Sequence, residues 1–321
     1  MAERSIIDQL DDAVTALLAE REPVVNEADR ELAELVAVAR ELRGLPSEQF
    51  RAALKEQLGD DMSTTAKQIE KSKKYKREGF HTVTPYIIAQ PAVELIDFVK
   101  AAFGAVESFR STGSAGGLHC ELKIGESVVM IAGGPTFDPR PVAIHLYVSD
   151  VDEFYARAVS AGATSLAEPS DQAYGERVAG VKDIGGNEWY IAKRFDETPI
   201  QDLHMVTLYF HPVGAPKFIN FLENAFGGEV LERHQSPEGF VYHAKVRLGD
   251  SIVEMGEAHD QWQPMQSAIY LYVEDVDSAY KQALSAGGTS AKEPSNEPYG
   301  DRSAWVNDEF GNVWYISTWL G

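Results

Sequence analysis

Apolar residues in the first part of the chain recur at spacings of three and four, the period of an amphipathic helix. The recurring positions are Ile6, Leu10, Val14, Leu17 and Leu18, followed by Leu32, Leu35, Val36 and Ala39. Gly44 stands where a helix C-cap would be, and Pro46 suits the start of a third short helix. Residues 1–58 are therefore predicted to be a helical N-terminal segment. Two interpretations stay open: a small bundle or docking arm for a protein partner, formed by residues 5–58, or helices packed on the rest of the chain.

Residues 59–79 are polar and almost free of large aliphatic side chains. They turn basic toward their end, at Lys71, Lys73, Lys74, Lys76 and Arg77. This composition predicts a solvated linker, with a basic partner-binding tail as the alternative.

From Phe80 onward the pattern changes to the alternation of strands, interrupted by helical periods. Strands are predicted over residues 81–88, 118–124, 127–132 and 143–148, and helices over 92–104 and 150–162. The same order returns over residues 204–210, 215–227, 242–248, 251–255, 268–273 and 275–287. The chain therefore contains two repeats, residues 80–196 and 203–321, and each repeat is itself two βαβββ halves.

The duplication is plainest in "YGERVAGVKDIGGNEWYI", residues 174–191, which returns as "YGDRSAWVNDEFGNVWYI", residues 299–316. Eleven of the eighteen positions match. The Gly186-Asn187 and Gly311-Asn312 pairs predict the turn of a hairpin, with Trp189 and Trp314 directed into the core. The repeated motif therefore mainly determines the fold.

Charge and cysteine content exclude several classes of function. The formal charge of −21 disfavours nucleic acid and anionic membrane surfaces, which need a Lys/Arg footprint. Cys120 is the single cysteine, which excludes an intrachain disulfide and a thiolate zinc cluster. The first residues lack the pattern of a secretory signal, and no apolar run approaches the roughly 20 residues of a membrane span. We expect a cytoplasmic protein.

The ordered motifs "HTVTPY", "IDF", "AFGA", "SVVMIA", "HLYVSDVD" and "YG.R…D..G..W.I" resemble the vicinal-oxygen-chelate superfamily, which contains glyoxalase, bleomycin-resistance proteins and extradiol dioxygenases. The motifs are most similar to those of its PhnB-like branch. The resemblance covers both repeats and implies an α+β fold of two tandem glyoxalase-like domains. It further implies concave eight-stranded sheets with the helices outside, and an intrachain pseudo-dimer. It does not decide the chemistry, because function depends on the site.

Metal-dependent members of this superfamily place four ligands, usually His, Gln or Glu, on the concave face. The matching positions in the two repeats are Thr84 and Thr207, Met130 and Glu254, Ala143 and Ala268, and Tyr190 and Tyr315. Among these eight residues, only Glu254 is of a type that usually binds such a metal ion. A hairpin turn at Gly249-Asp250 would place Lys245 directly opposite Glu254, which favours a cross-strand ion pair. A metal or catalytic carboxylate and a polar contact with a bound ligand are the alternatives.

Histidines provide further candidates. His145 shares the concave face with Ala143, and a site between different repeats would join it to Glu254 and His211. These three residues could hold a divalent Ni, Zn, Fe or Mn ion, although a hydrogen-bonding pocket histidine is favoured for His145. His81 and His204 lie on the opposite face and are interpreted as structural.

Aromatic residues dominate the rest of the predicted concave face. The candidate ligand-binding residues are Thr84, Tyr86, Met130, His145, Tyr147, Arg177, Tyr190, Thr207, Tyr209, Glu254, Tyr270, Arg302 and Tyr315, with Tyr272 beside them. Aromatic walls with a few hydrogen-bonding heads suit a small organic molecule. Alternatively, the tyrosines and arginines only hold the two domains together. Loops carrying Phe137 and Trp262 could overhang such a cavity.

Three functions follow from this pattern. The favoured one is binding of a small organic molecule without a tightly bound metal. The second is a metal-dependent isomerase, lyase or dioxygenase with a degenerate site near His145 and Glu254. The third is a ligand-sensing regulator that docks a partner through its N-terminal helices.

Overall fold

The computed structural model describes residues 75–112, 117–134, 136–196 and 198–321, together with Ala13, Ala16, Pro23 and Val36. The predicted helical segment 1–58, its docking role and most of the predicted linker lie outside the described residues. The chain divides into two units, Met1–Glu70 and Lys71–Gly321, and the fold below belongs to the second. Within the described part, no helix combines the length and hydropathy needed to span a bilayer.

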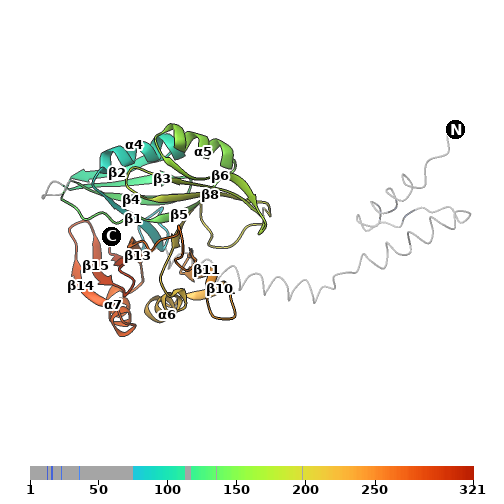
Figure 1. The fold of residues 1–321 in the computed structure, drawn as a ribbon. Coiled ribbons are helices and arrows are strands. Elements are labelled where there is room, and N and C mark those ends of the chain that lie inside the picture. Colours follow the sequence, from blue (N-terminus) through green and yellow to red (C-terminus); the bar gives the residue numbers. More distant parts are fainter. Residues whose placement is uncertain are drawn as a thin grey trace, which may run out of the picture. The chain divides into compact units, whose positions relative to one another are not determined.

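The second unit consists of four βαβββ modules in chain order (Figure 1). Module 1 is β1 (Val83–Ala89), α4 (Ala92–Phe103), β2 (Val106–Thr112), β3 (Leu118–Ile124) and β4 (Ser127–Gly133). Module 2 is β5 (Ala143–Tyr147), α5 (Val151–Ser160), β6 (Thr164–Gln172), β7 (Glu176–Lys182) and β8 (Glu188–Arg194). Module 3 is β9 (Val206–Phe210), α6 (Ala215–Phe226), β10 (Glu229–Gln235), β11 (Val241–Leu248) and β12 (Ser251–Met255). Module 4 is β13 (Ala268–Tyr272), α7 (Val276–Ser285), β14 (Thr289–Asn296), β15 (Asp301–Asn307) and β16 (Val313–Trp319).

The strands form two eight-stranded mixed sheets, each of which combines one module from each repeat. Sheet 1 joins modules 4 and 1 in the order β14-β15-β16-β13-β1-β4-β3-β2. Sheet 2 joins modules 3 and 2 in the order β10-β11-β12-β9-β5-β8-β7-β6. The joints are antiparallel pairs, β1 with β13 and β5 with β9, which place Thr84 opposite Tyr270 and His145 opposite Thr207. The concave faces therefore lie between the repeats.

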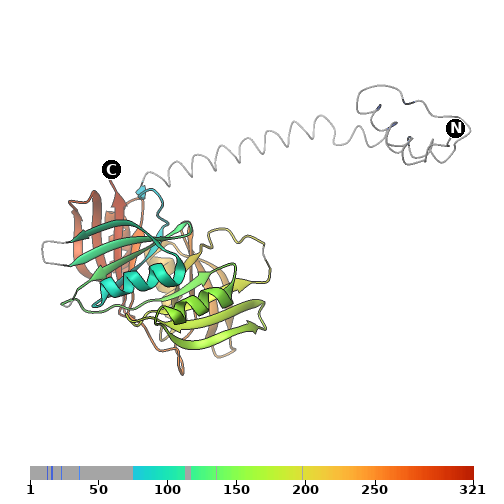
Figure 2. The same ribbon diagram turned by 90° about the horizontal axis from the view of Figure 1, so that it is seen from above.

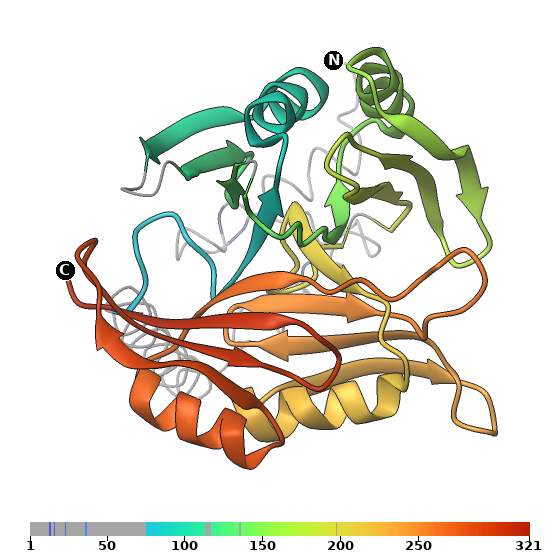
Figure 3. The same ribbon diagram turned by 60° about the vertical axis from the view of Figure 1, so that its left-hand side comes forward.

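The helices lie outside the sheets, as the resemblance implied. Helices α4 and α5 lie side by side over the half-sheets of the first repeat, and α6 and α7 over those of the second (Figures 1 and 2). Figure 3 shows the two helix pairs on opposite sides of the molecule. Phe103 at the end of α4 packs on Trp189 of β8, with ring centroids 4.6 Å apart. Phe226 of α6 packs on Trp314 of β16 at 4.7 Å in the same way. Each repeat therefore shares its helix-side core between its two modules, while each sheet is shared between the repeats.

The repeated motif closes the last hairpin of each repeat through one buried aspartate. Asp183 accepts hydrogen bonds from the backbone N–H groups of Gly185 (2.8 Å) and Asn187 (3.0 Å), and from Trp189 Nε1 (2.8 Å). Asn187 Oδ1 accepts from the Val142 backbone N–H, which holds the approach to β5. Gly186 has φ +84°, a left-handed conformation that explains the glycine of the turn. Burial raises the pKa of Asp183 and outweighs the hydrogen bonds that lower it.

Asp308 does the same in the second repeat, where it accepts from Trp314 Nε1 and the Asn312 side chain, both at 2.9 Å. We expect Asp308→Ala to lower the free energy of unfolding by about 3 kcal/mol, because several buried donors lose their acceptor. Urea denaturation followed by tryptophan fluorescence measures this change. Asp152→Ala, which removes an exposed carboxylate bonded to Arg177, is the control and should lower the free energy of unfolding much less. Equal losses for the two variants would contradict the role given to Asp308.

Candidate ligand-binding site

Alternation along four central strands of sheet 2 builds its concave face. Residues of one parity, such as Leu208, Leu146 and Ile191, belong to the core beneath the helices. Residues of the other parity point into the concavity: Thr207 and Tyr209 of β9, His145 and Tyr147 of β5, Glu254 of β12 and Tyr190 of β8. The register then brings them together, because His145 pairs with both Thr207 and Tyr190 across its two neighbouring strands, and Glu254 pairs with Tyr209.

Glu254 is the polar centre of this face. It is 0 % exposed, and its Oε2 contacts Nδ1 of His145. Its Oε1 accepts a hydrogen bond from the Tyr147 hydroxyl at 3.0 Å and lies 3.9 Å from Lys245 Nζ. Glu254 and Lys245 are paired across the β11–β12 hairpin, as predicted from the Gly249-Asp250 turn. Burial acts to raise the pKa of this carboxyl, but the charge and hydrogen bond of His145, with smaller contributions from His243 and Lys245, lower the pKa to about 2. Glu254 is therefore an anion held by His145, Tyr147 and Lys245.

Aromatic rings surround the Glu254–His145 pair. The His145 ring lies 4.9 Å from Tyr209, 5.6 Å from Tyr190 and 5.7 Å from Tyr147, centroid to centroid. Burial, together with the nearby Glu254 charge, raises the pKa of Tyr147 and Tyr209, so both hydroxyls keep their protons. Trp262, from the loop after β12, is close enough to Tyr190 to act against the rise in its pKa that burial causes, and so approaches this face. The result is a ring of proton-bearing hydroxyls around the Glu254 carboxylate and the His145 ring.

His211 continues the face beyond the end of β9. Its Nε2 lies 3.3 Å from the Tyr190 hydroxyl, and burial is the main reason that its pKa is lowered to about 4. Among the described residues, the one set of three His, Cys, Asp or Glu residues whose ligand atoms all lie within 4.8 Å of one another is elsewhere. The structure thus brings His145 and Glu254 together, and places His211 against Tyr190 instead.

The concave face of sheet 1 carries the other candidates but is filled by the chain itself. Met130, Tyr270 and Tyr272 form a second buried cluster with Phe80 and Val128, against which Tyr75, Tyr86, Tyr315 and Trp319 pack. Thr84, which lies on this face, is 1 % exposed. Arg77 lies over the rings of Phe80 and Trp319, and its Nη2 donates to Glu121 at 3.0 Å. The segment that precedes β1 therefore occupies the place that a ligand would take on this sheet.

Asp301 is a functional candidate that the sequence analysis missed. It is 1 % exposed at the start of β15 and accepts a hydrogen bond from the Tyr270 hydroxyl, while its Oδ1 has no hydrogen-bond partner among the described residues. Burial is the main cause that raises its pKa to about 6. Glu176 takes the matching place at the start of β7, and burial raises its pKa as well. The sequence does carry a signal for these two residues, because an acidic residue follows the Tyr-Gly pair in each repeat.

The two arginines that follow these acidic residues lie away from both concave faces. Arg177 donates to Asp152 of α5 and to Asp171, at 2.6 and 2.7 Å. Arg302 donates to Asp277 of α7 at 2.6 Å and to Asn296 at 3.0 Å. Both have the parity of the helix-side core residues Ala179 and Ala304, so each ties a helix to its sheet. The structure does not bring them together with the tyrosines.

Comparison with known proteins identifies the architecture. The family described as the Glyoxalase/Bleomycin resistance protein/Dioxygenase superfamily matches residues 81–191 and 214–316. The chain belongs to this superfamily. An uncharacterized protein of Mycobacterium bovis is 35% identical over 136 residues, which cover 38% of this chain and 86% of that protein. An uncharacterized protein of Mycobacterium tuberculosis matches equally well over 77% of its length. The match is to the superfamily, and the PhnB-like branch stays a prediction.

A solved structure shares the two-sheet fold. Glyoxalase I from Zea mays aligns over 73% of this chain and 92% of its own, with a TM-score of 0.56 and 18% identity. At this identity the likeness shows the fold alone. It confirms the tandem glyoxalase-like architecture predicted from the motifs.

The usual metal positions of the superfamily do not fit an ion here. Both Glu254 oxygens are taken by His145, Tyr147 and Lys245. The Thr207 hydroxyl donates to the His204 carbonyl at 3.0 Å, and the Tyr190 hydroxyl donates to Glu188 at 2.8 Å. Met130, Ala143 and Ala268 offer no hard or borderline donor. No step through a metal on the concave faces is therefore derived.

Glu254 should stabilise the fold in a pH-dependent way. Because folding lowers its pKa from 4.5 to about 2, its carboxylate stabilises the folded state above pH 4.5, and this contribution is lost as the pH falls through 2. We expect Glu254→Gln to cost about 3 kcal/mol at pH 7, since it leaves His145 and Lys245 without their buried anion. Urea denaturation at several pH values should show the difference from wild type narrowing below pH 4.5. A difference that is constant with pH would contradict this account.

Asp301 should make the stability depend on pH in the opposite direction. Its pKa is raised from 3.8 to about 6, so the protonated acid suits the folded state and stability falls as the pH rises through 6. Asp301→Asn keeps the acceptor for Tyr270 and removes the charge. We expect it to be about 2 kcal/mol more stable than wild type at pH 8 and equal to it below pH 3.8, by the same denaturation measurement. A variant that is less stable at pH 8 would show that the charge is needed.

Proposed function

We propose that this protein binds a small organic molecule on the concave face of sheet 2, without a tightly bound metal on that face. The observation that carries the proposal is the fully buried Glu254 carboxylate, held by His145 and Tyr147 inside a ring of tyrosines. Buried charges are costly unless they are paired, and a protein retains them where they have a use. The single buried cysteine, Cys120, supports a cytoplasmic location as part of the same proposal.

The chemistry of this face favours an aromatic or amphipathic ligand. The rings of Tyr190, Tyr209 and His145 offer edge-to-face and stacking contacts, and their polar heads offer hydrogen bonds. The hydrogen bonds of His145 run through Nδ1, which leaves Nε2 for a bound molecule. Sheet 2 is preferred over sheet 1 because Tyr75, Arg77 and Phe80 already fill the equivalent place on sheet 1.

A thermal-shift screen of aromatic and amphipathic small molecules tests this function. A true ligand should raise the melting temperature with concentration, because it binds only the folded state. We expect Tyr190→Phe, which removes a hydroxyl from this face, and Glu254→Gln, which removes the charge that orients His145, each to weaken the best binder at least about 10-fold. Tyr315→Phe, at the matching position of sheet 1, is the control for Tyr190→Phe and should bind as wild type does. The proposal would be wrong if no compound changed the melting temperature, or if the variants on both sheets lost the same amount of binding affinity.

Proton-transfer catalysis on the same face is the second candidate. A carboxylate bound to Nδ1 of an imidazole orients the ring and stabilises its protonated form, so that Nε2 can take and return a proton. Glu254 and His145 have this arrangement. An isomerase or lyase reaction would then use His145 as acid and base. Mass spectrometry of ligands after incubation separates the candidates: enzyme-dependent conversion that His145→Gln abolishes supports catalysis, and unchanged ligand supports binding alone.

A further inference from the structure

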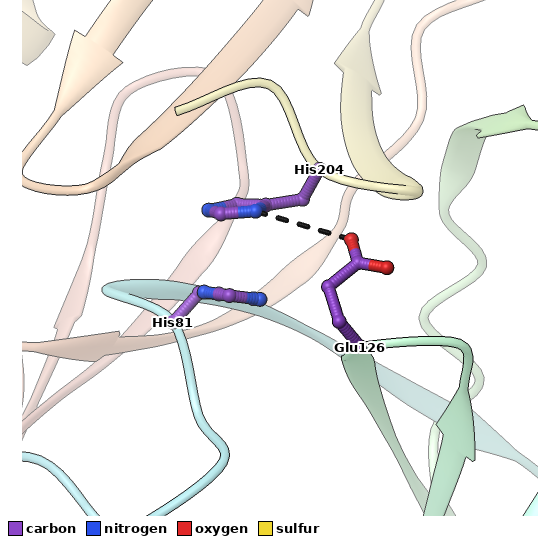
Figure 4. A group of neighbouring side chains, drawn as sticks. All are labelled: His81, Glu126 and His204. Atoms are coloured by element: carbon purple, nitrogen blue, oxygen red, sulfur yellow. Dashed lines mark ion pairs between the residues drawn. The ribbon is translucent and has the colours of Figure 1, made fainter. Parts of the chain in front are cut away.

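Two histidines and a glutamate meet at a place that neither concave face uses. His81 lies two residues before β1, His204 lies two residues before β9, and Glu126 stands in the turn between β3 and β4. The two imidazole rings stack with centroids 3.4 Å apart and planes 15° apart. Figure 4 shows both rings presenting a nitrogen toward the Glu126 carboxylate. One ligand atom from each residue lies within 4.8 Å of the other two.

The hydrogen bond on the far side of His204 fixes which nitrogen faces the cluster. His204 Nε2 lies 2.6 Å from the backbone carbonyl oxygen of Asp250. A carbonyl oxygen can only accept, so Nε2 carries the hydrogen and a neutral ring has its lone pair on Nδ1. That Nδ1 lies 4.0 Å from Glu126 Oε1. Metal-bound histidines are typically held by such an N–H bond to a backbone carbonyl, which orients the ring and sets its tautomer.

His81 contributes a buried nitrogen without a partner. Its Nε2 is inaccessible to solvent and makes no hydrogen bond within the described part of the chain. A buried polar atom without a partner costs free energy that a bound cation would recover. Glu126, by contrast, keeps 54 % of its side chain exposed, which gives an ion a path from solvent. Its Oε1 accepts hydrogen bonds from the Met205 backbone N–H at 2.7 Å and from the Ser127 hydroxyl at 3.1 Å, so an ion would share this oxygen or bind Oε2. Two imidazole nitrogens and a carboxylate group thus lie close to one another.

The spacing is close to that needed by a first-row divalent ion. Zinc bonds to nitrogen and oxygen are about 2.0 to 2.2 Å long, so two ligand atoms of a tetrahedral zinc lie about 3.4 Å apart. The 4.0 Å between His204 Nδ1 and Glu126 Oε1 would therefore have to shorten by about 0.6 Å. A modest rotation of the rings out of their stack, with a shift of the exposed carboxylate, would complete three protein ligands.

The internal symmetry of the chain predicts a single site. Asp250, in the turn between β11 and β12, is the counterpart of Glu126 in the turn between β3 and β4. Its carboxylate differs from that of Glu126 by one contact. Oδ1 accepts from the Thr82 backbone N–H at 2.7 Å, as Glu126 Oε1 accepts from the Met205 backbone N–H, but Oδ2 of Asp250 also pairs with Lys76. The more accessible carboxylate beside the stacked histidines is therefore that of Glu126, whose side chain is 54 % exposed against 38 % for Asp250.

We propose that His81, His204 and Glu126 bind one divalent transition ion, with Zn²⁺ the best match to two imidazoles and a carboxylate. Glu126 and His81 belong to the module that builds half of sheet 1, and His204 leads into sheet 2. The ion would therefore join the two sheets at the start of their central strands. This site is independent of ligand binding on the concave face of sheet 2.

Titration of the tag-free, chelator-treated full chain with Zn²⁺ tests the site. Isothermal titration calorimetry should show one ion per chain, and the melting temperature should rise with Zn²⁺ concentration. His204→Gln and Glu126→Gln should each weaken binding at least 10-fold, since each removes a ligand atom. His234→Ala, which removes an exposed histidine bonded to Glu232, is the matched control and should bind as wild type does.

Two further measurements keep the result decisive. Co²⁺ in place of Zn²⁺ should give a visible absorption spectrum of low-coordinate cobalt in wild type that Glu126→Gln alters, and circular dichroism should show that each variant is folded. Glu254→Gln separates this site from the concave face and should leave Zn²⁺ binding unchanged. Absence of Zn²⁺ binding by wild type, or loss of binding in Glu254→Gln with retention in His204→Gln, would overturn the proposal.

Discussion

The antiparallel pairing of β1 with β13 and of β5 with β9 is the interaction on which the rest of the structure depends. A four-stranded half-sheet alone would present the backbone of β1 or β5 as an open edge, with an apolar and aromatic concave side beside it. Pairing across the repeats removes both central edges. It also explains why the chain carries the motif twice, because each concave face needs one module from each copy. His145 and Glu254, 109 residues apart in sequence, become neighbours only through this joint.

The same symmetry makes the differences between the two concave faces informative. Glu254 on sheet 2 has three partners for its charge, and its pKa is lowered to about 2. Asp301 on sheet 1 faces mainly hydroxyls, and its pKa is raised to about 6. Sheet 1 is moreover filled by residues that precede β1, with Arg77 bound to Glu121. The concave face of sheet 1 is thus a packed interior in which burial disfavours the charged form of Asp301. The concave face of sheet 2 instead contains the Glu254 carboxylate, which is stabilised as an anion among hydroxyl groups.

Much of this architecture could be predicted from the sequence, because it depends on short-range patterns. Period-two alternation located most strands, and the Gly249-Asp250 turn fixed Lys245 opposite Glu254. The outer strands were harder to place. β6 and β14 are mostly exposed, so no buried face imposes alternation on their residues. Arg177 and Arg302 show why parity matters as well as proximity to a motif, since their parity matches that of Ala179 and Ala304 on the helix side.

The contact between His81 and His204 could not be predicted from the sequence, for a physical reason. Alternation places His81 and His204 apart from the concave residues, yet it does not show what they face instead. His81 precedes β1 of sheet 1 and His204 precedes β9 of sheet 2, so their contact depends on how the two sheets approach each other. The available signal was a histidine at the same position of both repeats, since equivalent positions lie near each other only at a symmetry axis. Glu126 and Asp250 then diverged, one left open to solvent and the other paired with Lys76. A symmetric histidine contact with one exposed carboxylate beside it can hold a single ion, and no pattern within one repeat can reveal such a site.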